Sequence, residues 1–176
     1  MSLTTAVDLR RWIRDVPDFP QPGILFRDIT PLLADPVAFG ASIDALAGLC
    51  AGRKIDVVAA AEARGFIFGG PLALKLNAGF VPIRKPGKLP SHTLAVEYDL
   101  EYGTDRLEIH NDALRPGQRV LLLDDVLATG GTMAACVELV ERSGAHVVAC
   151  AFLIELKFLA GDAKLKNIDV LSVITY

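Results

Sequence analysis

The segment spanning residues 120–154 places the strongest constraint on the fold, because it consists of a strand, a loop, a helix and a second strand. Val120 to Leu123 and Val147 to Ile154 are apolar throughout, which is typical of strands buried on both faces of a parallel sheet. Between them, Thr132 to Ser143 has apolar residues at helical spacing and a glycine just after its end. Such a crossover is right-handed, so the two strands are expected to be parallel.

The first half of the chain predicts a second unit of the same kind. Ile55 to Ala61 is an almost wholly apolar strand, a helix follows Gly65, and Phe80 to Ile83 is a short strand. Between the two units, the residues from Thr93 to Tyr102 alternate between apolar and polar, and a returning strand contains Leu107 and Ile109. We therefore expect an α/β domain with an antiparallel hairpin inserted between its two halves.

The N-terminal region is less regular. The spacing of apolar residues from Leu3 to about Val16 predicts a short amphipathic helix. Five prolines then interrupt residues 17–36, which cannot form one regular element. Asp35 as the N-cap and Pro36 as the first helical residue predict a helix that continues until Gly52.

Composition restricts the class of protein. The chain has 176 residues, the length of a single domain, which we expect to span 1–176. Its formal net charge of −3 argues against a nucleic-acid partner. Its 3 cysteines are too few and too widely spaced for a disulfide framework or a zinc site. No apolar stretch approaches the ~20 residues of a membrane helix, and the first residues lack the apolar segment of a signal peptide. We expect a cytoplasmic protein with no membrane partner.

Two adjacent acidic residues and a loop of small residues follow the strand that begins at Val120. Asp124 and Asp125 lie at the carboxyl end of that strand, the edge at which open α/β sheets bind ligands. In the next loop, glycines let the backbone approach a ligand, and successive N–H groups point out of the helix N-terminus, as in a phosphate cradle. The cradle residues are Ala128, Thr129, Gly130, Gly131 and Thr132. Because carboxylates accept hydrogen bonds from sugar hydroxyls or organise a divalent cation, the pattern predicts a phosphorylated ribose.

Other motifs with glycine-rich loops fit less well. A Walker A loop needs a lysine after its glycines, and a dinucleotide fingerprint needs G-x-G; the chain has neither. A purely structural turn would have to keep both carboxylates facing solvent, because burying unpaired charges costs several kcal/mol per ion.

Residues 120–132 resemble the phosphoribosyl-pyrophosphate motif of type I phosphoribosyltransferases. Four more segments resemble adenine phosphoribosyltransferases in the same order along the chain, namely PDFPQPGILFRDITPLL (17–33), AAEARGFIFG (60–69), IRKPGKLP (83–90) and YDLEYGTDRLEIH (98–110). The resemblance implies a type I phosphoribosyltransferase-like fold, with a mostly parallel sheet flanked by helices. It also implies an N-terminal hood that binds the base, over about residues 1–34, and a flexible flap over about residues 84–110.

The reaction implied by the resemblance converts adenine and phosphoribosyl pyrophosphate to AMP and pyrophosphate, with Mg²⁺. The cradle would hold the 5′-phosphate, and Asp124 and Asp125 the ribose hydroxyls, with magnesium brought mainly by the substrate and lying near these two carboxylates. Pyrophosphate would be bound by Glu62, Ala63, Arg64, Arg84, Lys85 and Lys88, with a cis peptide between the first two of these residues. Glu101 and Tyr102, at the tip of the flap, are the catalytic candidates.

By the same resemblance, adenine recognition would fall on Leu25, Phe26 and Arg27. In an extended segment the carbonyl of Leu25 and the N–H of Arg27 point to the same side, and this acceptor and donor match the N6 amino group and N1 of adenine. Oxopurines reverse both groups and would leave buried polar groups unpaired. Phe26 could stack on the base or, equally well, belong to the core.

For other residues the pattern alone leaves a structural role open. Arg64 could be a solvated surface arginine, and the basic turn at 84–88 a solvated face. Glu101 shares a polar strand face with Glu97 and Asp99, and only the match to LEYG selects it. The resemblance further implies a homodimer. The alternatives are a hypoxanthine/guanine or xanthine phosphoribosyltransferase, and a non-catalytic regulator of the same fold that senses phosphoribosyl pyrophosphate.

Overall fold

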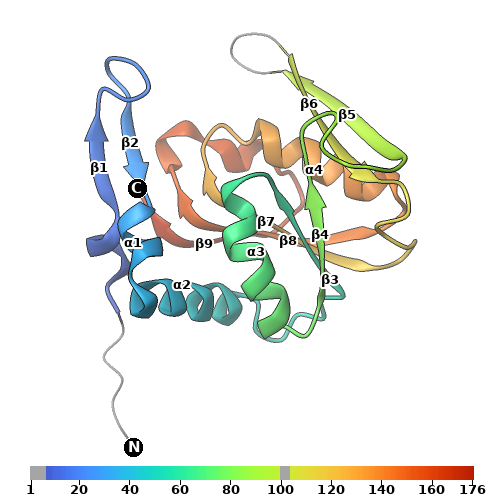
Figure 1. The fold of residues 1–176 in the computed structure, drawn as a ribbon, viewed down its shortest axis with the longest axis horizontal. Helices are drawn as coiled ribbons and strands as arrows, with labels where there is room; N and C mark the ends of the chain where they lie inside the picture. Colours follow the sequence, from blue (N-terminus) through green and yellow to red (C-terminus); the bar gives the residue numbers. More distant parts are fainter. Residues whose placement is uncertain (1–6, 100–103) are drawn as a thin grey trace, which may run out of the picture. The chain divides into compact units, whose positions relative to one another are not determined.

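The computed structural model describes residues 7–99 and 104–176. By internal contacts the chain divides into two compact units, Met1–Ala45 and Leu46–Tyr176. The larger unit is built on a five-stranded sheet in the order β4-β3-β7-β8-β9, in which every neighbouring pair is parallel (Figure 1). Its strands are β3 (Val57–Ala61), β4 (Gly79–Ile83), β7 (Arg119–Leu127), β8 (His146–Glu155) and β9 (Val170–Thr175).

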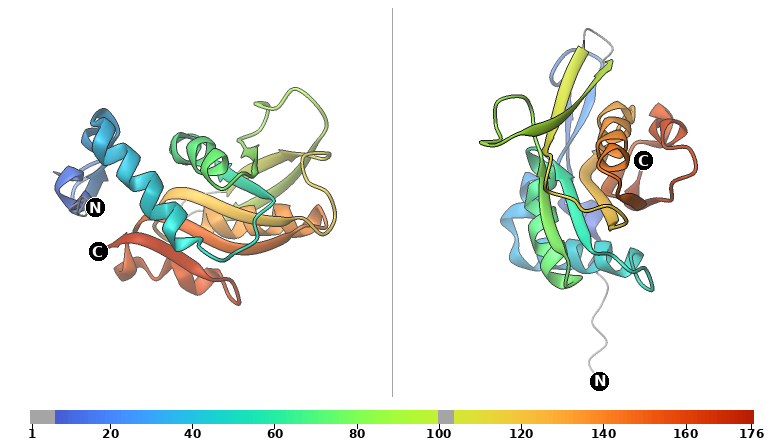
Figure 2. Two further views of the ribbon diagram at one scale, coloured as in Figure 1. Left: turned by 90° about the horizontal axis from the view of Figure 1, so that it is seen from below. Right: turned by 90° about the vertical axis from the view of Figure 1, so that its right-hand side faces the viewer.

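The strand order contains one reversal of direction, and it lies between β3 and β7. From β3 the chain passes through α3 (Arg64–Lys75) to β4 on one side, then returns to β7 and passes through α4 (Gly131–Arg142) to β8 on the other side. Right-handed crossovers in opposite directions put the two helices on opposite faces of the sheet, as the right-hand view in Figure 2 shows. Ligand sites in sheets of this order form at such a reversal, beyond the carboxyl ends of the strands.

Both faces of the sheet are covered, so its strands are apolar rather than alternating. All five residues of β3 are buried, as are Leu121, Leu122 and Leu123 of β7. Cys136 and Cys150 lie in the same core, and all three cysteines are buried and free. Both βαβ units predicted from the apolar pattern are confirmed, and β9 is a further strand that the pattern did not predict.

The predicted hairpin is present as β5 (Thr93–Asp99) and β6 (Thr104–His110), which pair in antiparallel register with Leu94 opposite Ile109. Its apolar face packs against the core through Val96, Leu107 and Ile109. The side chain of Arg142 in α4 donates a hydrogen bond of 3.2 Å to the carbonyl of Ala95. This hydrogen bond connects the hairpin to the helix that follows the predicted phosphate cradle.

In the smaller unit, the predicted N-terminal helix was wrong. Where an amphipathic helix was expected up to about Val16, the described part of the segment forms a short 3₁₀ turn, η1 (Leu9–Trp12), and then a strand, β1 (Arg14–Pro17). The side chain of Asp8 accepts a hydrogen bond from the N–H of Arg10 and caps the turn, and Ile13 is already extended. A short isolated helix is only marginally stable by itself, and here the residues from Arg14 onward pair with a second strand instead.

That second strand is β2 (Leu25–Asp28), which pairs antiparallel with β1. Two helices follow, α1 (Thr30–Ala34) and α2 (Pro36–Leu49). The predicted cap of α2 is confirmed, because Asp35 Oδ1 accepts hydrogen bonds from the N–H groups of Val37 and Ala38 at 3.0 and 2.8 Å. None of the helices in the described residues has the length and hydropathy needed to span a membrane.

Candidate functional site

A cavity of about 250 Å³ opens at the carboxyl edge of the sheet, at the reversal between β3 and β7. Parallel pairing brings the ends of β4, β3 and β7 to this one edge. Seven of the sequence-predicted residues line the cavity, namely Glu62, Ala63, Arg64, Lys85, Asp124, Asp125 and Thr132. Residues separated by 70 positions in the sequence therefore share one site.

The carboxylate pair lies inside β7 rather than in a loop after it. The sequence predicted a strand ending at Leu123, but β7 continues to Leu127, and β8 pairs with it as far as Glu155. The apolar residues Val126 and Leu127 keep the strand in the sheet beyond the two acids. The loop is correspondingly short, because α4 already begins at Gly131.

Asp125 is buried, with 3% of its surface exposed, and its charge is balanced by Arg64. Arg64 Nε lies 2.9 Å from Asp125 Oδ2 and forms an ion pair with it, but the two groups are not aligned as a hydrogen bond. Oδ2 therefore accepts no hydrogen bond from the described residues. Burial raises the pKa of Asp125 more than Arg64 lowers it. Burial, and then the neighbouring charge of Asp125, raise the pKa of Asp124 well above its usual range. The pair is poised to accept partners that donate hydrogen bonds or carry positive charge.

Two glycines in the first half of α3 allow this helix to lie close to the sheet. A Cβ atom on Gly65 would come within 3.0 Å of Asp124 Oδ1, and one on Gly69 within 2.6 Å of the Phe80 ring. Residues four apart share one face of a helix, so both glycines face the strands. This close approach sets the N-terminus of α3, and with it Arg64, beside the carboxylates of β7.

Glu62 connects the loop after β3 to the basic turn after β4. Its Oε2 accepts two hydrogen bonds from Arg84, at 3.0 and 2.8 Å, and its Oε1 accepts one of 2.7 Å from the N–H of Lys85. Burial alone would raise the pKa of Glu62, but these hydrogen bonds lower it overall. The peptide bond between Glu62 and Ala63 is cis, as the resemblance implied. Arg84 also donates to the carbonyl of Lys88, at 3.3 Å, but neither Arg84 nor Lys88 lines the cavity.

The predicted phosphate cradle lines a second, smaller cavity of about 80 Å³ that shares Asp124 and Thr132 with the first. All five predicted cradle residues line it: Ala128, Thr129, Gly130, Gly131 and Thr132. Gly130 is the N-cap of α4 and has φ +78°, a conformation that side chains rarely adopt. The first N–H groups of α4 therefore open onto a space of about the size of an anion.

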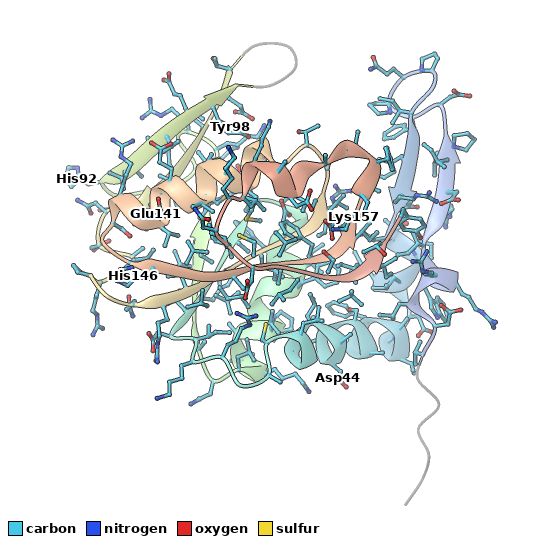
Figure 3. The ribbon with its side chains drawn as sticks, turned by 180° about the vertical axis from the view of Figure 1, so that it is seen from behind. Asp44, His92, Tyr98, Glu141, His146 and Lys157 are labelled. Atoms are coloured by element: carbon cyan, nitrogen blue, oxygen red, sulfur yellow. The ribbon has the colours of Figure 1, made fainter. Side chains whose placement is uncertain are left out.

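Sequence reasoning missed three residues that line the larger cavity, namely Tyr98, Asp105 and Leu107. Tyr98, labelled in Figure 3, donates a hydrogen bond of 3.3 Å to Asp105 and lies 3.4 Å from the hydroxyl of Thr132. Asp105 belongs to β6, and its Oδ2 is 3.0 Å from Lys85 Nζ. The alternation of the hairpin could have placed Tyr98 on the inward face, but no local signal identifies Asp105.

The residues predicted to bind adenine lie in the smaller unit. Leu25, Phe26 and Arg27 form the extended β2, as the hydrogen-bond argument required. Leu25 is exposed, the Phe26 ring packs edge-on against Phe19 at a centroid distance of 5.2 Å, and Arg27 forms an ion pair with Asp15. The catalytic candidates Glu101 and Tyr102 lie outside the described residues.

A metal would have few protein ligands at this site. In the described parts of the chain, no three His, Cys, Asp or Glu side chains converge as a metal-binding cluster. Magnesium, however, is commonly held by one or two carboxylates, with water and substrate phosphates completing its shell. The adjacent carboxylates of Asp124 and Asp125, including the buried Oδ2 that accepts no hydrogen bond, fit this mode.

Comparison with known proteins gives a consistent result. Residues 32–174 match the model of the phosphoribosyl transferase domain. The chain is 61% identical over 170 residues to an adenine phosphoribosyltransferase of Rhodopirellula baltica, covering 97% of this chain and 82% of that protein. The crystal structure of adenine phosphoribosyltransferase from Thermoanaerobacter pseudethanolicus matches with a TM-score of 0.95 and 56% identity, covering 98% of this chain and 100% of that one.

A more distant structure carries ligands. The adenine phosphoribosyl transferase of Trypanosoma brucei, in complex with AMP, pyrophosphate and ribose-5-phosphate, matches with a TM-score of 0.84 and 26% identity. The match covers 99% of this chain and 82% of that one.

Proposed function

The chain belongs to the phosphoribosyl transferase domain family, and we propose that it transfers the phosphoribosyl group of phosphoribosyl pyrophosphate to adenine, yielding AMP and pyrophosphate. One observation carries the proposal: a single edge of the sheet combines a phosphate cradle, an acidic pair and two cationic side chains in adjoining cavities. These groups complement, in order, the 5′-phosphate, the ribose hydroxyls and the pyrophosphate of one substrate molecule.

We assign the 5′-phosphate to Ala128, Thr129, Gly130, Gly131 and Thr132. The support is the 80 Å³ cavity at the N-terminus of α4, where backbone N–H groups and two hydroxyls are available. Charge-assisted hydrogen bonds of roughly 1.5–3 kcal/mol each would hold the ribose in a fixed orientation.

We assign the 2′ and 3′ hydroxyls of the ribose to Asp124, which lines both cavities, and to Asp125, which lines the larger one. Carboxylates accept the hydrogen bonds that hydroxyls donate. Ribose hydroxyls would also donate a hydrogen bond to Asp125 Oδ2, which accepts none from the described residues.

Pyrophosphate is assigned to the loop Glu62, Ala63 and Arg64 and to the turn that contains Arg84, Lys85 and Lys88. Arg64 and Lys85 line the larger cavity from two different strand ends, which suits a ligand with several negative charges. Glu62 would act indirectly, since it binds Arg84 and the main chain of Lys85 and so connects the two segments. Arg84 and Lys88 would reach the ligand only after some rearrangement, because neither lines the cavity.

Magnesium is expected to arrive with the substrate, held by pyrophosphate oxygens and by Asp124 or Asp125. When bound, the ion would neutralise part of the negative charge that builds up on the departing pyrophosphate. The support is the chemistry of the acidic pair described above.

The transfer breaks the bond between the anomeric carbon and a pyrophosphate oxygen and forms a bond to a ring nitrogen of adenine. The proton that this nitrogen loses is released to water as the departing pyrophosphate takes the bonding electron pair. Positive charge develops on the ribose as the first bond breaks, so the negative charges of Asp124 and Asp125 favour the transition state. Arg64 and Lys85 stabilise the charge on the leaving group. Glu101 and Tyr102, which follow β5 in the sequence, are proposed to act at the purine, on the strength of the resemblance of YDLEYG to the family.

Adenine is assigned to Leu25, Phe26 and Arg27, in a hood that spans about residues 1–34. The extended conformation of β2 supports the pairing of the Leu25 carbonyl with the amino group and of the Arg27 N–H with N1. The Phe26 ring contacts Phe19 edge-on. This contact is compatible with two roles for Phe26, one in lining the base site and one in the core of the hood.

We further propose a homodimer in the cytoplasm. Ile67 and Leu74, seven residues apart on one face of α3, are 38% and 84% exposed, and such a solvent-facing apolar pair favours association. Three buried free cysteines are consistent with a reducing compartment. We also propose that residues 1–176 work as one phosphoribosyltransferase domain. Within it, residues from about 84 to 110 would form the flexible flap.

The assignment can be tested with purified protein, adenine, phosphoribosyl pyrophosphate and magnesium, separating products by anion-exchange chromatography. AMP and pyrophosphate should appear in equal amounts. Asp124→Asn combined with Asp125→Asn should raise KM for phosphoribosyl pyrophosphate strongly, and Glu101→Gln should lower kcat with little change in that KM. Failure of the unmodified protein to form AMP would contradict the proposed reaction.

A further inference from the structure

Two glycines from distant parts of the sequence meet beneath the phosphate cradle. A Cβ atom on Gly161 would overlap the carbonyl oxygen of Ala128 and lie 3.0 Å from the backbone nitrogen of Gly130. A Cβ atom on Gly130 would in turn overlap the carbonyl oxygen of Gly161. All of these neighbours are backbone atoms, so no side-chain rotation could make room. The backbone of the cradle rests directly on the backbone at residue 161.

Glycine is needed at position 161 for space alone. Gly130 has φ +78°, so an alanine there would be strained as well as crowded, whereas Gly161 lies outside the left-handed region. An alanine at 161 could therefore keep the local backbone conformation. The three atoms nearest to its Cβ would all belong to the backbone of Ala128 and Gly130, which makes position 161 a probe of this contact.

The segment that carries Gly161 is anchored at several points. It leaves β8 where the N–H of Leu156 donates a hydrogen bond of 2.9 Å to the carbonyl of Leu127, the last residue before the cradle. Lys157, labelled in Figure 3, has its Nζ 2.6 Å from the buried Glu155 and 3.4 Å from Asp162. The 3₁₀ turn η3 (Gly161–Lys164) then begins at Gly161 itself. The segment that carries Gly161 is thus bound to the sheet on the N-terminal side of this residue and continues into a helical turn on the C-terminal side.

We propose that Gly161 is a positioning residue for the phosphate cradle. Because Gly161 has no side chain, the backbone of residues 128–130 can lie directly against it, and this position orients the N–H groups of the cradle toward a phosphate monoester. The inference rests on the proposed binding of a 5′-phosphate at this loop. To open this overlap to even 3.0 Å, a Cβ atom at residue 161 and the carbonyl oxygen of Ala128 would have to separate by about 0.8 Å, which would tilt the peptide groups that follow Ala128. Hydrogen bonds to an anion weaken steeply when their alignment is lost. Gly161 lines neither of the two cavities, so its effect would act through the cradle.

Gly161→Ala, with Gly70→Ala as the matched control, tests the proposal. Gly70 lies inside α3 and has no atom within 4 Å of its potential Cβ, so the same substitution there should change nothing at the site. Binding of AMP, which carries the phosphate monoester, and of inorganic pyrophosphate, assigned to the other end of the site, would be measured by isothermal titration calorimetry.

In Gly161→Ala the dissociation constant for AMP should rise at least tenfold, while that for pyrophosphate should stay within twofold and the stoichiometry for both should remain near one. Partial unfolding would instead lower the stoichiometry for both ligands and would overturn the proposal, as would a variant that does not fold at all. AMP affinity within twofold of the unmodified protein would also overturn it. If the unmodified protein binds no AMP, the proposed function fails together with this inference, whereas the other negative results leave the function standing.

Discussion

Lys85 Nζ lies 3.0 Å from Asp105 Oδ2, so the cation assigned to pyrophosphate is paired with a carboxylate of the hairpin. Asp105 Oδ2 also accepts a hydrogen bond from the hydroxyl of Tyr98. The hydrogen bond and the charge of Asp105 raise the pKa of Lys85, which stays protonated. An incoming pyrophosphate must therefore compete with Asp105 for this cation.

Asp105→Asn should tighten the binding of pyrophosphate two- to fivefold, because it removes the competing charge but keeps an oxygen for its neighbours. The gain is limited to about 0.5–1 kcal/mol, since Lys85 is largely exposed and solvent screens the pair. Titration calorimetry with pyrophosphate measures it. Glu97→Gln, an exposed residue of the same hairpin, controls for the change in net charge. Weaker binding in Asp105→Asn would mean that Asp105 assists the ligand rather than competes with it.

Asp124→Asn should make the ligand-free protein more stable and the enzyme less active. The substitution removes a charge that burial and the adjacent Asp125 both disfavour, and it keeps the oxygen that accepts the N–H of Asp125 at 2.9 Å. We expect a rise in Tm of about 2–4 °C, equivalent to about 1 kcal/mol in a chain of this size. Differential scanning calorimetry at pH 7 checks it, with the exposed Asp112→Asn as control. A lower Tm would show that the charge of Asp124 stabilises the fold.

At the opposite edge of the sheet, Asp56 and Arg119 should matter for stability but not for catalysis. Asp56 Oδ2 accepts hydrogen bonds from the N–H and Nε of Arg119, and Oδ1 accepts one from Nη2, which together lower the pKa of Asp56 to about 2. A lowered pKa means that the stabilisation is present above the unfolded-state pKa near 4 and is lost as the pH falls toward 2.

Asp56→Asn should therefore lower Tm at pH 7, and the difference from the unmodified protein should shrink between pH 4 and pH 2. Thermal unfolding followed by circular dichroism across this range measures the effect, and kcat at pH 7 should be unchanged. A difference in Tm that stays constant down to pH 2 would contradict the linkage.

The βαβ units could be predicted from sequence because their signals are local. The uniform apolar strands, the Asp35 cap and the glycine after α4 each act within a few residues, and each appears where expected. The end of β7 could not be predicted, because the pattern becomes polar at Asp124 while pairing with β8 continues to Leu127. Tertiary pairing outweighed the local change in polarity.

The candidate site divides in the same way. The cradle and the acidic pair are contiguous in sequence, so their chemistry is readable from one motif. Asp105 and Gly161 each contact a partner that is distant along the chain, Lys85 for the first and the backbone of Gly130 for the second. A single sequence contains no signal that connects them.

Replacing the exposed apolar pair on α3 should separate the proposed dimer. Ile67→Glu combined with Leu74→Glu would place two charges on a surface meant to be buried, where each lost apolar side chain costs about 1.5–3 kcal/mol. Sedimentation velocity at micromolar concentration should find a dimer for the unmodified chain and a monomer for the variant. Val37→Glu, at another exposed apolar position, is the control. A variant that remains dimeric would exclude this face as the interface.

The most direct measurement offers adenine, hypoxanthine, guanine and xanthine together, at equal concentration, to the protein with phosphoribosyl pyrophosphate and magnesium, and quantifies the four nucleotides by chromatography. AMP should exceed each of the others by at least about a hundredfold, because oxopurines reverse the donor and acceptor that the main chain of Leu25 and Arg27 presents and leave buried polar groups unpaired. Formation of IMP, GMP or XMP at a rate equal to or above that of AMP would contradict adenine as the substrate.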